Sequence, residues 1–123
     1  MASEQTIQQR IRLALSKGPV RLFRNNTGAL RDERGQLVRY GLCTGSADLI
    51  GFRQVEITPD MVGQRLAVFA AVEVKSSTGK PTADQEAFIT MVKHFGGIAG
   101  VARSVEEAAA LLQRPSAESE LQR

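Results

Sequence analysis

The stretch LAVFAAVEVK at residues 66–75 is the most apolar run of the chain. It shows little polar alternation before Glu73, as expected of a central strand that is buried on both faces. Glu73 and Lys75 close the run, and residues two apart on a strand point to the same face. Because an unpaired buried charge is costly, these two side chains need a partner or a metal ion.

Turn residues and helix caps divide the remaining chain. Thr82 followed by Gln85 forms a capping-box pattern, and Ser104 with Glu107 repeats it. In chain order, we expect a helix over residues 3–16, a strand over 20–25, a loop or loose hairpin over 29–40, strands over 46–52 and 66–74, a helix from 82 to 95, a strand over 98–102 and a helix from 104.

This order predicts an α/β domain with a central mixed β-sheet flanked by helices. We expect a single domain over residues 1–113, followed by a polar, flexible tail at 114–123. No apolar run approaches the roughly 20 residues that cross a bilayer. The polar N-terminus does not resemble a signal peptide, so we expect a cytoplasmic protein without membrane contact.

The composition restricts the kind of metal site. One Cys and one His exclude an ordinary zinc site within the chain. Any metal ligands must therefore be oxygens, which favours Mg²⁺ or Mn²⁺.

The charge is concentrated in the first third of the chain. Net charge is +3, and residues 1–40 hold eight Lys or Arg against three acids. This excess favours phosphate binding, although many soluble domains carry uneven, solvated charge. The residues that we expect to contact the phosphates of a nucleic acid are Arg21, Arg24, Asn26, Arg31 and Lys80.

Asp48 is a third ionisable residue in an unexpected place, because Asp is a poor strand residue and lies inside the predicted strand 46–52. If that strand pairs with 66–74, Asp48 meets Glu73, and a divalent cation would relieve their repulsion. The carbonyl of Val74 would supply a further oxygen ligand. Such a site suits hydrolysis of a phosphodiester by water. Lys75 would hold or help activate the attacking water and would offset the negative charge of the transition state. The alternative is a salt bridge between Glu73 and Lys75, with Asp48 pairing with a basic residue or capping a turn beside Gly51.

The spacing Asp48 … Glu73-Val74-Lys75 resembles the PD-(D/E)xK nuclease superfamily, with Ala47 in place of the Pro. The segments GSADLIG at 45–51 and GGIA at 96–99, together with Gln85, are similar to a standalone VRR-NUC domain of the kind found in phages and prophages.

The resemblance implies a restriction-endonuclease-like core and Mg²⁺- or Mn²⁺-dependent DNA cleavage. It implies Asp48 and Glu73 as metal ligands, Lys75 as the catalytic lysine and Gln85 near the site. It also suggests Glu4 as an additional ligand. Small standalone members resemble Holliday-junction resolvases, so we expect a homodimer acting on branched or structured DNA in a bacterial or phage-infected cell.

Other interpretations stay open at this point. Gln85 also fits a purely capping role, and Glu4 fits a first-turn acid favoured by the helix dipole. The substrate would alternatively be flap, nicked or linear DNA. A catalytically silent DNA-binding module on the same fold, or a structural assembly protein, would use the same charges without chemistry.

Overall fold

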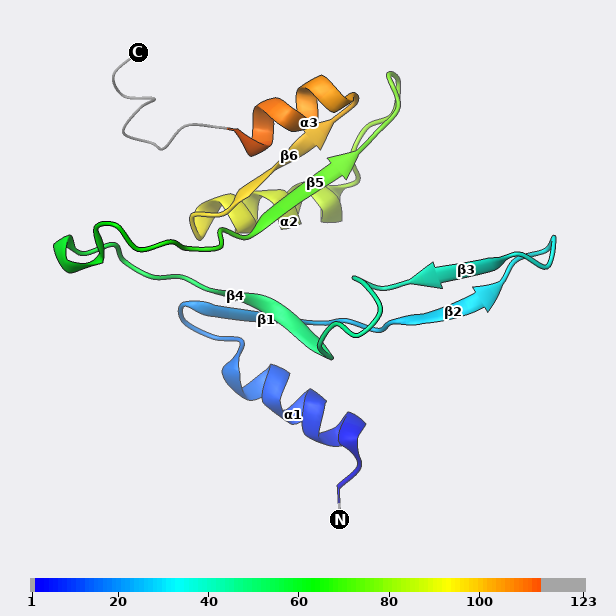
Figure 1. Cartoon of the computed structure of the whole chain (residues 1–123), viewed down its shortest axis with the longest axis horizontal. Coiled ribbons are helices and arrows are strands. Elements are labelled where there is room, and N and C mark those ends of the chain that lie inside the picture. The colour runs from blue at the N-terminus through cyan, green and yellow to red at the C-terminus, as the bar shows by residue number, and fades with distance from the viewer. Residues whose placement is uncertain (1, 114–123) are drawn as a thin grey trace. The chain divides into compact units, whose positions relative to one another are not determined.

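The computed structural model describes residues 2–113, so the tail expected at 114–123 lies outside the described residues. The chain divides into two units, Met1–Ile57 and Thr58–Arg123, and each is described by itself (Figure 1). The assignment of residues 1–113 to one domain stays a prediction. None of the helices in the described part of the chain is long and apolar enough to cross a membrane.

The first unit contains one helix and two antiparallel strand pairs. The elements are α1 (Glu4–Leu15), β1 (Val20–Arg24), β2 (Gly28–Arg31), β3 (Leu37–Tyr40) and β4 (Leu49–Arg53). β1 pairs with β4, and β2 pairs with β3. The β2–β3 pair is a hairpin, which was one of the two forms, loop or loose hairpin, expected for residues 29–40.

Helix α1 begins where predicted, because the Ser3 side chain accepts a hydrogen bond from the backbone N–H of Thr6. Ile7, Ile11 and Leu15 recur at helical spacing, which predicts that they face the core, but the structure leaves them exposed. The partly buried residues of α1 are Gln8 and Arg12. The apolar stripe stays exposed, at 46% for Ile7, 39% for Ile11 and 53% for Leu15.

The second unit is a parallel strand pair joined by a helix. The elements are η1 (Pro59–Met61), β5 (Ala70–Val74), α2 (Ala83–His94), β6 (Ile98–Ala102) and α3 (Val105–Leu112). α2 connects β5 to β6 and packs on both strands, and α3 packs on β6. The buried core consists of Val92 of α2 with Ala99 and Ala102 of β6.

Gly100 allows α3 to approach β6 closely. A Cβ at this position would lie 2.7 Å from a terminal methyl carbon of Leu111. The small residues of β6 therefore explain why this strand accepts helices at short distance.

The expectation of one central sheet is not met in the described residues, where six short strands form three two-stranded sheets. The prediction that residues 66–74 form a strand buried on both faces is wrong. β5 begins only at Ala70, and Val74 is 73% exposed. Apolar composition favours a strand, but burial requires neighbours on both faces, and composition does not supply them.

Candidate active site

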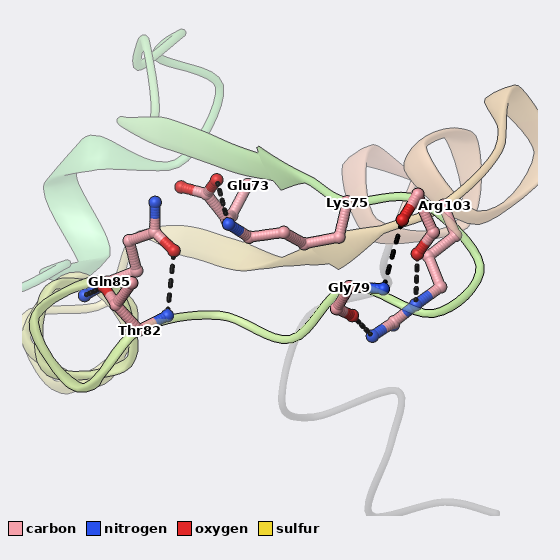
Figure 2. Close-up of polar contacts among 7 residues, drawn as sticks. Glu73, Lys75, Gly79, Thr82, Gln85 and Arg103 are labelled. Atoms are coloured by element: carbon pink, nitrogen blue, oxygen red, sulfur yellow. Dashed lines mark hydrogen bonds and ion pairs between the residues drawn. The ribbon is translucent and has the colours of Figure 1, made fainter.

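Glu73 and Lys75 lie side by side at the end of β5. Lys75 follows the strand, and its backbone N–H donates to the carbonyl of Ala102 at 3.1 Å, so pairing with β6 extends past Val74. The Lys75 Nζ lies 3.6 Å from Glu73 Oε2 (Figure 2). This contact confirms that both side chains lie on one face, and it is also the salt bridge that the alternative interpretation expects.

The ion pair is partly shielded from solvent. The side chains are 20% exposed for Lys75 and 29% for Glu73. Glu73 also lines an open depression of about 400 Å³ between β5 and α2. A substrate group entering this depression would meet the carboxylate beside its lysine. The depression is lined by Ala71, Val72, Glu73, Asp84, Gln85, Phe88 and Ile89.

Gln85 closes a capping box at the start of α2. The side-chain Oε1 of Gln85 accepts a hydrogen bond from the backbone N–H of Thr82 at 2.9 Å, and the backbone N–H of Gln85 donates to Thr82 Oγ1 at 3.1 Å. The predicted capping role is therefore confirmed. In Figure 2 the amide nitrogen of Gln85 points away from Thr82, toward the side on which Glu73 lies. A role in catalysis stays a prediction, and the cap does not prevent it.

Arg103 holds the loop that follows Lys75, a role that no local pattern in the sequence indicates. Its Nε donates to the carbonyl of Ser76 at 3.2 Å and its Nη2 to the carbonyl of Gly79 at 2.8 Å (Figure 2). The Ser76 hydroxyl also accepts from the Gly79 N–H at 3.1 Å. Because Ser76 adjoins Lys75, this network restrains the backbone from which the lysine projects.

Asp48 lies in the first unit, exposed and directly before β4 rather than inside a strand as predicted. Its carbonyl accepts from the Asn25 N–H at 2.8 Å, which extends the pairing of β1 with β4 by one residue. Pairing ends there because the preceding loop turns back on itself. Asp48 and Glu73 belong to different units, so their approach stays a prediction.

Asn25 anchors the loop that carries Asp48. Its Nδ2 donates to Ser46 Oγ at 2.7 Å and to the carbonyl of Ala47 at 2.9 Å. Its Oδ1 accepts from the Leu42 N–H at 3.0 Å. The signal in the sequence was the turn-forming run Asn25-Asn26, but nothing local revealed partners some twenty residues away.

The predicted DNA contacts are spread over several elements. Arg24 Nε donates to Asn26 Oδ1 at 3.0 Å, so these two residues lie together after β1. Arg21 donates hydrogen bonds from Nη1 to the carbonyls of Gly18 and Val20. Arg31 donates one from Nη1 to the carbonyl of Gly35. Lys80 is exposed in the loop before α2.

The ligands proposed for a metal are all oxygens. Among residues 2–113, no group of three or more His, Cys, Asp or Glu is gathered in a way that could hold a metal ion. Glu73 nevertheless offers a carboxylate that opens on the depression, and the Asp48 carboxylate and Val74 carbonyl are hard donors of the same kind. This chemistry fits Mg²⁺ or Mn²⁺. Glu4 lies exposed in the first turn of α1.

A comparison with protein families gives one match. A family model described as the VRR-NUC domain matches residues 2–106. Neither the curated proteins nor the solved structures contain a match to the chain. The matched range includes Asp48, Glu73, Lys75 and Gln85.

Proposed function

The chain belongs to the VRR-NUC family, whose domain implies a nuclease of the PD-(D/E)xK type, and on this premise we propose a divalent-metal-dependent endonuclease that hydrolyses DNA phosphodiesters. Asp48, Glu73 and the carbonyl of Val74 would hold the metal. Nucleases of this family are typically metal-dependent, and Mg²⁺ or Mn²⁺, when bound, polarises the phosphate and acidifies a water.

The observation that carries this proposal is the 3.6 Å pair of Lys75 Nζ and Glu73 Oε2 beside the depression. In this position the ammonium group would donate hydrogen bonds to a water next to Glu73 and orient it toward a phosphate. It would also offset the negative charge that develops on the phosphate in the transition state.

The remaining site residues act on the substrate and its surroundings. The Gln85 amide lines the same depression and would donate to the water or to a phosphate oxygen. Glu4 would add an acidic ligand from α1. Arg21, Arg24, Asn26, Arg31 and Lys80 would contact the DNA backbone.

DNA is the substrate that the domain implies, and we propose branched or structured DNA, such as a Holliday junction, as the preferred form. The support is the resemblance to small standalone members of the family. Symmetric cleavage of a junction needs two active sites, so we propose a homodimer. The proposed setting is the cytoplasm of a bacterial or phage-infected cell.

The test uses the purified chain with Mg²⁺ or Mn²⁺ and labelled four-way junction, flap, nicked duplex and plain duplex. Lys75→Ala should lower kcat on the order of 10²–10³-fold, as loss of one transition-state donor does. Lys93→Ala, which removes an exposed lysine from the last turn of α2, should leave the rate unchanged.

The panel also separates the alternatives. The substrate cleaved fastest decides between junction and flap, nicked or linear DNA. Binding without cleavage under both metals would replace the nuclease with a silent DNA-binding module. Cleavage that survives both EDTA and Lys75→Ala would contradict the assigned chemistry.

A further inference from the structure

A second hollow lies in the first unit, between α1 and the end of the β1–β4 pair. Its volume is about 190 Å³, and no proposed metal ligand lines it. We name it the α1 pocket and define it by its lining residues, Gln5, Gln8, Gln9, Arg12, Arg24 and Leu49.

The lining has the chemistry of an anion site. Arg12 and Arg24 bring two guanidinium groups to one hollow, and arginine keeps its charge in proteins. The three glutamines add amide N–H donors. No Asp or Glu is among the lining residues, although Glu4 and Asp48 are the chain neighbours of Gln5 and Leu49, so the charged side chains of the lining are all positive. An anion in the pocket would pair with them.

Helix α1 presents these groups as a continuous face. Gln5, Gln8, Gln9 and Arg12 are spaced at i, i+3, i+4 and i+7, which places them on one side of a helix. Gln8 and Arg12 are also the partly buried residues of α1, whereas Ile7 remains 46% exposed. The polar face of α1, and not its apolar stripe, therefore lies against the β1–β4 pair, where its amide and guanidinium groups are still accessible to a ligand.

The strands complete the pocket from the other side. Arg24 and Leu49 are cross-strand partners at the end of the β1–β4 pair. The Nε of Arg24 is held by Asn26 Oδ1 at 3.0 Å, which orients the guanidinium plane. Leu49 directly follows Asp48, so the pocket adjoins the segment that carries the proposed metal ligand.

We propose that the α1 pocket binds a backbone phosphate of the DNA strand that is being cut. This inference rests on the proposed function and deepens it, because it assigns Arg12 and the glutamines of α1 to the substrate. A phosphate is small enough for the hollow, and arginine recognises it through paired hydrogen bonds. The pocket positions the strand and carries no sequence preference.

The experiment measures DNA binding by fluorescence anisotropy in EDTA, so that no cleavage occurs, over a series of salt concentrations. Arg12→Gln and Arg24→Gln should each weaken binding several-fold on every sequence. Each should also reduce the slope of log K against log salt by about 1. Arg10→Gln, an exposed arginine of α1 outside the pocket, should change neither quantity appreciably.

A second arm titrates inorganic phosphate into the wild-type chain. If phosphate binds and Arg12→Gln abolishes it while DNA affinity and salt slope are unchanged, the pocket is a small-anion site and the proposal is overturned. Equal losses in Arg12→Gln and Arg10→Gln would also overturn it, since they would indicate diffuse charge. Thermal melts of each variant verify that it is folded.

Failure of this proposal and failure of the nuclease assignment can be told apart. A chain whose DNA binding depends on Arg12 and Arg24 but which never cuts DNA would refute the proposed hydrolysis and leave phosphate binding by the pocket intact. A chain that cuts DNA, with binding unchanged in both pocket variants, would refute the pocket and leave the hydrolysis intact.

Discussion

The two units hold their strands together by different means. In the second unit, α2 and α3 pack on β6 around the buried side chains of Val92, Ala99 and Ala102. In the described part of the first unit no residue is fully buried. There the segment that precedes Asp48 is held by hydrogen bonds that converge on Asn25. In the proposed site, the strand of Glu73 and Lys75 is thus supported by packing, with the Arg103 hydrogen bonds holding the loop that follows it, and the segment before Asp48 is supported by polar contacts.

The largest effect should come from the core of the second unit. Val92 is 1% exposed, and Val92→Ala removes its packing and leaves a cavity. We expect a loss of about 2 kcal/mol in the free energy of unfolding. Urea denaturation measures it against Val105→Ala, since Val105 is 81% exposed. Equal midpoints for the two variants would contradict the assigned core.

The same measurement tests the first unit. Ile11 is 39% exposed, so Ile11→Ala should cost less than Val92→Ala. A larger loss at Ile11 would show that the apolar stripe of α1 is covered in solution and would reverse the comparison.

A smaller effect is expected at Asn25. Asn25→Ala removes three side-chain hydrogen bonds from the loop before Asp48, which should cost about 1–2 kcal/mol of stability. Because Asp48 is then less well placed, Mn²⁺ binding measured by calorimetry should also weaken.

Two further variants test this assignment. Asn25→Asp keeps the acceptor for the Leu42 N–H but loses both donors, so its Mn²⁺ affinity should be intermediate. Asn26→Ala, in the adjacent position, should leave Mn²⁺ affinity unchanged. Unaltered Mn²⁺ binding in Asn25→Ala would show that the loop does not depend on this residue.

The smallest effect should come from Arg103, a positioning residue in the second unit. Arg103→Ala loses the bonds to the carbonyls of Ser76 and Gly79, worth about 1 kcal/mol at an exposed site. If all of that loss reaches the transition state through Lys75, kcat falls about fivefold and KM does not change.

Arg103→Lys should restore part of the rate, and Arg53→Ala, at the exposed end of β4, should behave as wild type. A rise in KM with unchanged kcat would instead make Arg103 a DNA contact.

Local signals in the sequence were sufficient to predict interactions between residues that are only a few positions apart. The caps at Ser3, Thr82 and Ser104 are all observed, because each joins a side chain to a backbone N–H three residues away. The pairing of Glu73 with Lys75 was equally legible, since strand alternation alone places them together. The ends of strands were less predictable from the sequence. Asp48 was expected inside a strand, but β4 begins at Leu49.

The sequence alone is enough to predict the α/β character, the helix starts, the same-face placement of Glu73 and Lys75 and the nuclease family. The folded structure adds that β5 pairs in parallel with β6, and that Arg103 donates to two carbonyls of the loop after Lys75. It also adds that Asn25 holds the segment before Asp48 and that α1 turns Gln8 and Arg12 inward. These features join residues far apart in the chain, so they depend on how the backbone folds back on itself. Local propensity and spacing carry no information about that path.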